Sequence, residues 1–191
     1  MREISTVRIE GDAVKWEKIE WTSVPEHLNI QGRQQHSAVS FRGKIYLFGG
    51  CFSFNRKRHA RECTNQVLEF DPYLRTMTVV KTFGQAINSR KNHTAVTYKN
   101  SMVVFGGASE NDFIFNDMLV YNFDDCEWVR IPFGGYQGPC FTQGSACTVI
   151  ARKDATNFNV RKVSPPQLLI CVQSDQVQEG IYYFGGKTGS N

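Results

Sequence analysis

The phrase Tyr46-Leu47-Phe48-Gly49-Gly50 decides the fold, because the chain repeats it as Val103-Val104-Phe105-Gly106-Gly107 and as Tyr182-Tyr183-Phe184-Gly185-Gly186. Each copy reads as an apolar strand that ends in two glycines. Paired glycines after a buried strand let the backbone turn with positive φ and let a neighbouring chain approach closely. Three such pairs after matching strands predict an architecture of repeated β-units.

Polar residues recur at fixed distances from these glycines. Arg33 and His36 precede the first pair, and Arg90 and His93 precede the second, with 13 positions from each histidine to the first glycine of its pair. In the third unit Gly144-Ser145-Ala146 stands in the place of the His-Ser/Thr-Ala sequence. The third unit is therefore expected to keep the repeat frame and to lack the histidine.

Each unit is predicted to hold up to four strands, A to D, and the chain to be all-β. β-branched and aromatic residues broken by short polar turns favour strands, and no stretch shows a capped helical period. The predicted A strands are Ser37–Phe41, Thr94–Tyr98 and Ser145–Ile150, and the B strands are Lys44–Phe48, Ser101–Phe105 and Gly180–Phe184. The predicted C strands are Gln66–Asp71 and Asp117–Asn122, and the D strands are Thr76–Lys81 and Glu127–Ile131.

This pattern resembles the kelch repeat, in which a glycine pair is followed by a tyrosine and a tryptophan with six residues between them. Three pairs of residues fill these positions: Ile9 and Trp16, Phe70 and Met77, and Tyr121 and Trp128. The resemblance implies β-propeller blades of four antiparallel strands. A four-stranded sheet cannot bury both faces alone, so the blades are expected to stack, with Trp16, Met77 and Trp128 packing between them.

The repeats predict one propeller segment over residues 1–191. Residues 1–21 would be the outer strands of a partial blade, 33–81 and 90–131 two full blades, and 143–186 the inner strands of another, interrupted by the insertion 152–179. Propellers usually have four to eight blades. We therefore expect an incomplete ring, an open arc that missing blades or another chain would complete.

The composition is that of a soluble globular protein, with 41% hydrophobic and 21% charged residues and a net charge of +4. No apolar run is long enough for a membrane span, and the N-terminus lacks the apolar core of a secretory signal. The six cysteines form no Cys-x-x-Cys pair and are interpreted as reduced thiols. These features predict a cytoplasmic location and no membrane partner.

No catalytic or metal site is predicted. Cys51, His59 and Cys63 share one loop, but their spacing matches no standard zinc frame and a fourth ligand is missing. His36 and His93 could be acid–base groups, yet their equivalent repeat positions favour a shared structural role. No phosphate loop, nucleophile elbow or carboxylate cluster is present, so no cofactor is expected.

The candidate binding residues are basic. The segment Arg56-Lys57-Arg58-His59-Ala60-Arg61 follows the first glycine pair and concentrates positive charge. It is either a solvated loop or a patch for an acidic protein surface or a nucleic-acid backbone. Arg33 and Arg90 lie near the same loops and are either packing residues or ligand contacts. No aromatic ladder accompanies these residues, so nucleic acid is the second choice of partner.

The resemblance implies a non-enzymatic protein–protein interaction module or scaffold subunit that presents loops at one end of the ring to a protein partner, alone or within a large assembly. The alternatives are a small-molecule enzyme on a kelch propeller and a nucleic-acid-associated subunit that uses loop 56–61. The B-to-C and D-to-A loops should share one end of the blades. The insertion 152–179 joins strands A and B, so it should emerge at the other end as a second contact or as a simple extension of strand A.

Overall fold

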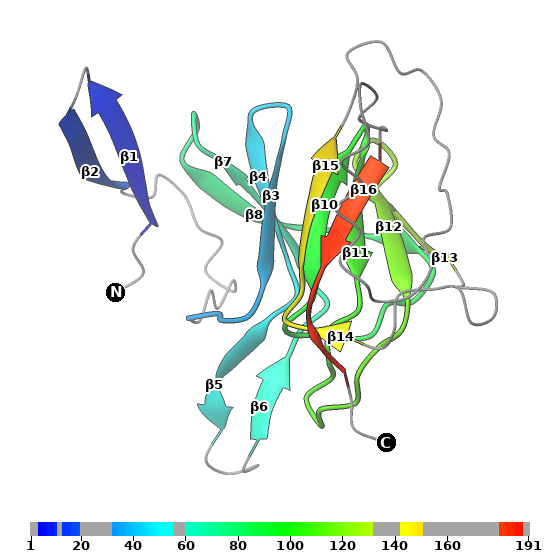
Figure 1. Cartoon of the computed structure of the whole chain (residues 1–191). Helices are drawn as coiled ribbons and strands as arrows, with labels where there is room; N and C mark the ends of the chain where they lie inside the picture. Colours follow the sequence, from blue (N-terminus) through cyan, green and yellow to red (C-terminus); the bar gives the residue numbers. More distant parts are fainter. Residues whose placement is uncertain are drawn as a thin grey trace, which may run out of the picture.

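The computed structural model describes residues 4–10, 13–19, 32–55, 60–131, 142–150 and 180–188. These residues form strands and turns, and no helix occurs among them. The all-β prediction is therefore confirmed for the described part of the chain. Figure 1 shows the strands gathered into sheets that stand side by side, with the β1–β2 hairpin apart from them.

Two sheets have the strand order of a propeller blade. Blade 1 consists of β3 (Ser37–Phe41), β4 (Lys44–Phe48), β7 (Val67–Asp71) and β8 (Thr76–Val80), in that order across the sheet. Blade 2 consists of β10 (Thr94–Tyr98), β11 (Ser101–Phe105), β12 (Met118–Asn122) and β13 (Glu127–Ile131). Neighbouring strands are antiparallel, and a short strand β9 (Phe83–Gly84) adds to the outer edge of β13 in parallel. The four predicted strands of each of these two sheets are thus confirmed, with strand boundaries shifted by at most one residue.

The third unit holds two inner strands, β15 (Ala146–Ile150) and β16 (Gly180–Phe184), which pair antiparallel. We call this pair half-blade 3. The short strands β14 (Thr142–Gln143) and β17 (Lys187–Thr188) pair beside it. The insertion predicted over 152–179 lies outside the described residues.

The register of half-blade 3 corrects the predicted alignment by one residue. Ala146 pairs with Phe184, as Ser37 pairs with Phe48 and Thr94 with Phe105. The histidine position is therefore filled by Ser145 and not by Gly144. Gly144 has φ 70°, and it corresponds to Gln35 (φ 61°) and Asn92 (φ 53°), so a left-handed residue is required here in all three units. A glycine adopts this conformation without strain, which explains its presence at this position.

The N-terminal hairpin joins β1 (Ile4–Glu10) to β2 (Ala13–Ile19). Trp16 pairs with Val7, whereas Tyr121 pairs directly with Trp128 in blade 2. Ile9 and Trp16, which fill the tyrosine and tryptophan positions of the repeat in the sequence, therefore do not pair as Tyr121 and Trp128 do. Its strands are separated by two residues, and the corresponding strands of blade 2 by four. The assignment of this hairpin as the outer strands of a blade stays a prediction.

The innermost strands β3, β10 and β15 run side by side, with β10 in the middle (Figure 1). One hydrogen bond repeats from blade to blade: the Asn92 N–H donates to the Gln35 oxygen at 3.0 Å, and the Gly144 N–H donates to the Asn92 oxygen at 2.8 Å. Each blade is thus placed on the previous one by the same backbone contact. The described strands form an open arc and do not close into a ring.

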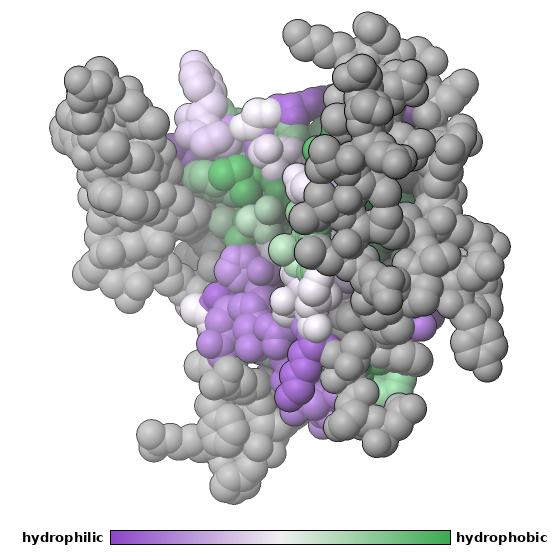
Figure 2. Space-filling model, viewed as in Figure 1, coloured by the Kyte–Doolittle hydropathy of each residue, from purple (hydrophilic) through white to green (hydrophobic). Residues whose placement is uncertain are grey.

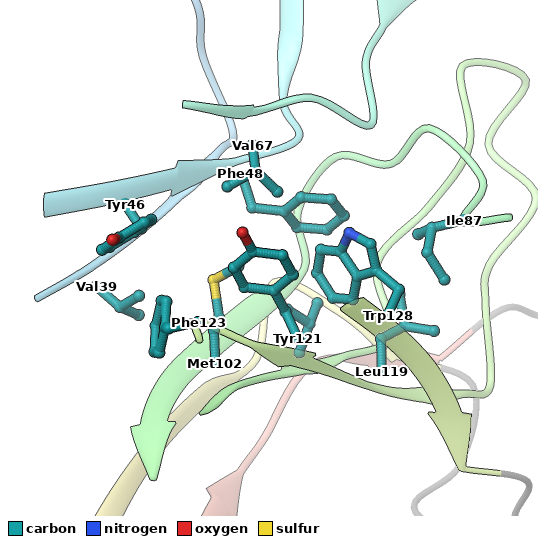
Figure 3. Packing of buried hydrophobic residues seen from close by; sticks show 11 residues of the cluster. Val39, Tyr46, Phe48, Val67, Ile87, Met102, Leu119, Tyr121, Phe123 and Trp128 are labelled. Carbon is teal, nitrogen blue, oxygen red and sulfur yellow. The ribbon is translucent and has the colours of Figure 1, made fainter. Parts of the chain in front are cut away.

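The main core lies between blades 1 and 2 (Figure 3). Trp128 is 2% exposed, and its ring lies 4.8 Å from that of Phe48 in blade 1 and 5.0 Å from that of Tyr121. Phe123 of blade 2 stacks on Phe41 of blade 1 at 4.2 Å. Aromatic rings bury large apolar areas, so this interface supplies much of the stability that a single sheet cannot reach alone. The expected packing of Trp128 between blades is what the structure shows.

Substitution of Trp128 should therefore weaken the packing of blade 2 on blade 1 and lower the stability of the protein. We expect Trp128→Ala to lower the free energy of unfolding in urea by about 3–5 kcal/mol, because the neighbouring rings cannot fill the cavity. Val129, which is 44% exposed on the other face of the same strand, provides the control. Val129→Ala should change stability by about 0.5 kcal/mol or less. Equal urea midpoints for the two variants would contradict this view of the interface.

Candidate partner-binding surface

The loop face is the end of the blades that carries the starts of the innermost strands and the connections after the glycine pairs. Two backbone bridges, Gln34 to Cys51 and Lys91 to Ala108, tie these segments together in equivalent places. In Figure 1 a hairpin of β5 and β6 projects from this end, and Figure 2 shows hydrophilic residues gathered beside it. The B-to-C and D-to-A connections thus share one end, as expected.

The segment after the first glycine pair is a hairpin and not the loop that the sequence suggested. Strand β5 (Cys51–Asn55) pairs antiparallel with β6 (Ala60–Cys63), and Asn55 lies opposite Ala60. Residues 56–59, with Arg56, Lys57 and Arg58, lie outside the described residues, and Arg61 is placed in β6 by its backbone only. The basic segment 56–61 therefore connects the two strands in the sequence and extends into β6. Alternation of Phe52 and Phe54 with small polar residues was the available sequence signal.

Two of the cysteines are not the reduced thiols that the sequence suggested. Cys51 and Cys63 face each other at the base of the β5–β6 hairpin, with 4.1 Å between their Cα atoms, and they form a disulfide. Cys51 is fully buried. Sequence spacing missed the pair because its two members come together only through the hairpin register. Cys126 and Cys147 carry free thiols, as expected.

Arg33 lies at the edge of the loop face and is partly exposed. Its guanidinium donates to the Gly49 oxygen at 3.3 Å and to Gln66 Oε1 at 2.9 Å, and it lies 5.3 Å from the centre of the Phe52 ring. Burial lowers the pKa of Arg33 to about 10, which leaves the side chain charged at neutral pH. Arg33 thus supports the first glycine pair and also offers charge at the surface.

Arg90 occupies the equivalent position in blade 2, but its side chain is completely enclosed. It makes a two-pronged ion pair with Asp117, at 2.7 and 3.0 Å, and donates to the Gly106 oxygen at 2.8 Å. Its guanidinium also lies 4.3 Å from the centre of the Phe115 ring. The planar fork of arginine suits this bidentate contact. Arg90 has no surface in this structure to offer a partner, so we leave it out of the proposed contacts.

The two histidines, equivalent in sequence, have different surroundings. His93 is 7% exposed, and its Nε2 atom lies 2.9 Å from Ser37 Oγ of blade 1. Its ring meets Phe48 edge-on at 5.1 Å, and a Cβ atom at Gly49 would lie 2.7 Å from His93 Cε1. Burial, reinforced by the nearby Arg90 charge, lowers the pKa of His93 to about 3. This histidine is a neutral packing group, whereas His36 is exposed.

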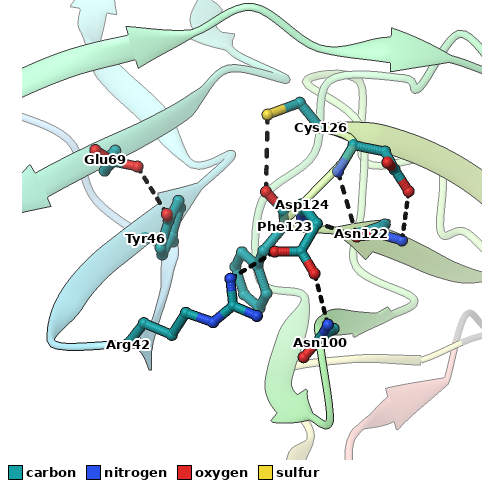
Figure 4. A network of polar contacts seen from close by, with 9 residues as sticks. Arg42, Tyr46, Glu69, Asn100, Asn122, Phe123, Asp124 and Cys126 are labelled. Atoms are coloured by element: carbon teal, nitrogen blue, oxygen red, sulfur yellow. Dashed lines mark hydrogen bonds and ion pairs between the residues drawn. The ribbon is translucent and has the colours of Figure 1, made fainter.

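The opposite end of the blades carries the A-to-B and C-to-D turns. Arg42 of blade 1 forms a 2.6 Å ion pair with Asp124 of blade 2, and Asn100 donates to the same carboxylate (Figure 4). The described residues that flank the insertion, Ile150 and Gly180, pair with each other at this end in Figure 1. These two residues therefore lie away from the loop face, and the position of the insertion itself stays a prediction.

A partly enclosed pocket lies between the outer edges of blades 1 and 2. It has a volume of about 310 Å³, and Gln66, Phe83, Gln85 and Trp128 contribute to its lining. None of the residues that line it titrates, so it offers no acid–base pair. Among the described residues no group of three or more His, Cys, Asp or Glu side chains could hold a metal ion. No helix in the described part of the chain is long and apolar enough to cross a membrane.

A protein-family model described as the KLHDC2/KLHL20/DRC7 Kelch-repeats domain matches residues 6–158. Among solved structures, that of YjhT is similar, with a TM-score of 0.59 and 15% sequence identity over 78% of this chain and 48% of YjhT. At this identity the likeness shows the propeller fold alone.

Several curated proteins match about half of this chain. Acyl-CoA-binding domain-containing protein 6 of Oryza sativa subsp. japonica is 25% identical over 114 residues, which are 59% of this chain and 16% of that protein. The Rho GTPase-activating protein gacHH of Dictyostelium discoideum is 24% identical over 106 residues, 54% of this chain and 7% of its own length. Ras guanine nucleotide exchange factor F of the same organism is 29% identical over 113 residues, 59% and 9% respectively. This chain spans less than a fifth of these relatives.

The buried histidine predicts a specific acid sensitivity. Because its folded pKa is about 3, His93 stays neutral in the folded protein while the unfolded chain takes up a proton below about pH 6.5. Stability should therefore fall as the pH drops from 6.5 toward 3, by about 2 kcal/mol at pH 5. His93→Gln should lack this component when urea unfolding is compared at pH 7.5 and pH 5. An unchanged pH dependence in His93→Gln would mean that His93 titrates normally. Variant His36→Gln, at the exposed equivalent position, should change the pH dependence less.

Proposed function

This chain belongs to the kelch-repeat family, and from that premise we propose that it is a non-enzymatic module that binds a protein partner through its loop face. The observation that carries the proposal is the β5–β6 hairpin, which leaves this face directly after the first glycine pair and whose two strands are joined in the sequence by a segment with Arg56, Lys57 and Arg58. Arg61 follows in strand β6. A projecting, positively charged hairpin on a rigid stack of sheets is suited to an acidic protein surface.

Further observations support a binding role over a catalytic one. The pocket between the blades has no titratable lining, and the two equivalent histidines differ in environment instead of converging on one site. The relatives bear different names, an acyl-CoA-binding protein, a Rho GTPase-activating protein and a Ras exchange factor, and share only a small part of their length with this chain. A segment found in such different proteins suits a binding unit added to other activities.

The nucleic-acid alternative shares the basic hairpin, but in the sequence no row of aromatic residues for base stacking accompanies the basic segment. Arg33, partly exposed beside the hairpin and still charged at neutral pH, belongs to the proposed contact. The cytoplasmic location stays a prediction. The Cys51–Cys63 disulfide counts against this location, because disulfides persist mainly in oxidising compartments.

Charge reversal on the hairpin tests this proposal. We expect the combined change Arg56→Glu, Lys57→Glu, Arg58→Glu and Arg61→Glu to weaken one protein partner, and the wild-type contact to weaken with added salt. Partners would be identified by cross-linking and mass spectrometry, and affinities then measured with the purified partner. The pair Arg56→Glu/Arg58→Glu has a matched control in Arg75→Glu/Lys99→Glu, two exposed basic residues at the opposite end.

Deletion of residues 153–178 tests whether the two ends act separately. We expect the deleted chain to keep the partner that depends on the hairpin and to lose a different contact. Double-stranded DNA tests the nucleic-acid alternative. It should bind Arg56→Glu/Arg58→Glu no more weakly than it binds the control Arg75→Glu/Lys99→Glu. If the reversal and the deletion removed the same partner from folded protein, the division into two faces would be wrong. If the hairpin reversal affected only DNA, the nucleic-acid alternative would replace the protein partner.

A further inference from the structure

The Cys51–Cys63 disulfide lies at the boundary between the fixed part of the loop face and the β5–β6 hairpin. On the blade side the backbone is anchored. The Cys51 N–H donates to the Gln34 oxygen at 2.9 Å, and the Gln34 N–H donates to the Cys51 oxygen at 3.0 Å. The Thr64 N–H, directly after Cys63, donates to the Gly50 oxygen at 2.9 Å. The chain is therefore held to blade 1 on the blade side of both cysteines.

The two cysteines depend on the sulfur bond for their direct link. In an antiparallel pair of strands, the N–H and the C=O of one residue point to the same side. Both of these groups in Cys51 are bonded to Gln34, so they point away from Cys63. The two cysteines are nevertheless directly opposite each other in the hairpin register. Their side chains therefore join the strands at a position where the backbone of Cys51 does not.

The hairpin beyond the disulfide has little support of its own. Within the described part of the chain, β5 and β6 form a separate two-stranded sheet, which projects from the blades in Figure 1. The register shifts between Cys51 and Phe54, so the ladder is interrupted directly after the disulfide. The described pairs that follow are Phe54 with Arg61 and Asn55 with Ala60. A two-stranded hairpin is marginally stable in water at best, so the disulfide is a main restraint on this one.

Blade 2 shows that the same place in a blade needs no disulfide. Ala108 and Ile114 are bridged there as Cys51 and Cys63 are paired in blade 1. Ala108 is completely buried, as Cys51 is. The connection in blade 2 is short, residues 109–113, whereas that in blade 1 comprises residues 52–62. The blades therefore do not depend on the sulfur bond, and its effect falls on the longer connection, which contains the hairpin.

The two cysteines differ in their access to solvent. Cys51 is fully buried, whereas Cys63 is partly exposed. Thiol–disulfide exchange begins when a thiolate reaches one of the two sulfurs, so access decides which sulfur is attacked. Cys63 is the cysteine that a thiolate from solvent can approach.

We propose that the Cys51–Cys63 disulfide is a reversible redox site that controls the partner contact of the β5–β6 hairpin. This inference rests on the function proposed above, in which the hairpin binds a protein partner. The oxidised protein holds the hairpin in the paired form that binds. Reduction leaves both blades folded, releases the hairpin beyond the two cysteines and weakens the contact.

The reaction is an exchange with a dithiol reductant. One thiolate of the reductant attacks Cys63 Sγ, the sulfur–sulfur bond breaks, and its electron pair goes to Cys51 Sγ, which takes up a proton. The second thiol of the reductant then loses its proton and attacks the reductant sulfur bound to Cys63. Cys63 leaves as a thiolate and takes up a proton. The protein gains two electrons and two protons and the reductant becomes a disulfide, and a disulfide oxidant reverses both steps.

The effect on affinity follows from the fraction of molecules with a paired hairpin. A partner that needs the paired form has a dissociation constant that rises by the inverse of this fraction. If reduction leaves about a tenth of the hairpins paired, the dissociation constant rises about tenfold. Arg33 keeps its place on reduction, because its acceptors Gly49 and Gln66 belong to blade 1 and not to the hairpin. The contact should therefore weaken and not disappear.

Hydrogen exchange of the whole chain with and without dithiothreitol tests the site in the absence of any partner. We expect reduction to remove protection from amides in 53–55 and 60–62. The amides of Cys51 and Thr64, which bond to the blade side, should stay protected, as should strand β11. Unchanged protection of the hairpin on reduction would overturn the proposal. Loss of protection in β11 would also overturn it, because the disulfide would then support the blades.

The variant Cys51→Ala/Cys63→Ile is the matched control, because it places the residues of blade 2 at the base of the hairpin. It should fold, and its hairpin should exchange like that of the reduced wild type both with and without dithiothreitol. Any effect of dithiothreitol on this variant would come from other thiols. If its hairpin were as protected as that of the oxidised wild type, the sulfur bond would not be the restraint and the proposal would fail.

The affinity for the purified partner found by cross-linking tests the control of binding. Dithiothreitol should raise the dissociation constant of the wild type about tenfold, and oxidised glutathione should restore it after dithiothreitol is removed. The control variant should bind with the weaker affinity in all three conditions. Equal affinity of the oxidised and reduced wild type, or no recovery on oxidation, would overturn the proposal.

The charge reversal Arg56→Glu/Arg58→Glu separates this inference from the proposed function. If the reversal weakens binding and reduction does not, the hairpin is the contact and the redox control alone is wrong. If neither change weakens binding although reduction releases the hairpin, the hairpin is not the contact and the proposed function is wrong as well.

Discussion

The arrangement of the blades depends on the close contact between one innermost strand and the glycine pair of the blade before it. Gly49 has no side chain, and His93 and the Arg90 backbone oxygen occupy the space that a Cβ atom would need. The Gly50 N–H donates to that same oxygen at 2.8 Å. Because glycine alone permits both this approach and the positive φ of the turn, the glycine pairs set the distance between blades. The aromatic core of Phe48, Tyr121 and Trp128 can form only at that distance.

The strand order within each blade separates the two ends of the blades. An up-and-down sheet must send successive connections to opposite ends, so the hairpin after the first glycine pair and the flanks of the insertion cannot meet. Arg33 and Arg90 stabilise the glycine pairs from the loop face, since each donates a hydrogen bond to the oxygen of the first glycine in its own blade. Support of this kind leaves the connections beyond the glycines free to differ, as the β5–β6 hairpin and the segment near Phe113 do.

The sequence predicts the regular parts of the fold because they depend on local chemistry. Alternating β-branched residues and glycine pairs predicted both ends of strands such as Lys44–Phe48 and Ser101–Phe105 correctly. What it missed depends on register and burial. The position of Ser145 follows from cross-strand pairing, the Cys51–Cys63 contact from the turn of a hairpin, and the enclosure of Arg90 from Asp117 across the blade. Spacing along the chain cannot distinguish the enclosed Arg90 from the partly exposed Arg33.

The most direct test of this contact between blades is native-state hydrogen exchange at the backbone amides of Gly50 and Asn92. These amides donate hydrogen bonds across the interface to the backbone oxygens of Arg90 and Gln35, respectively. If the blades form one cooperative unit, these amides should be protected as strongly as those of the central strand β11. Exchange of Gly50 and Asn92 at the rate of the exposed turn at Lys99, with β11 still protected, would show that the blades open independently and would contradict this account.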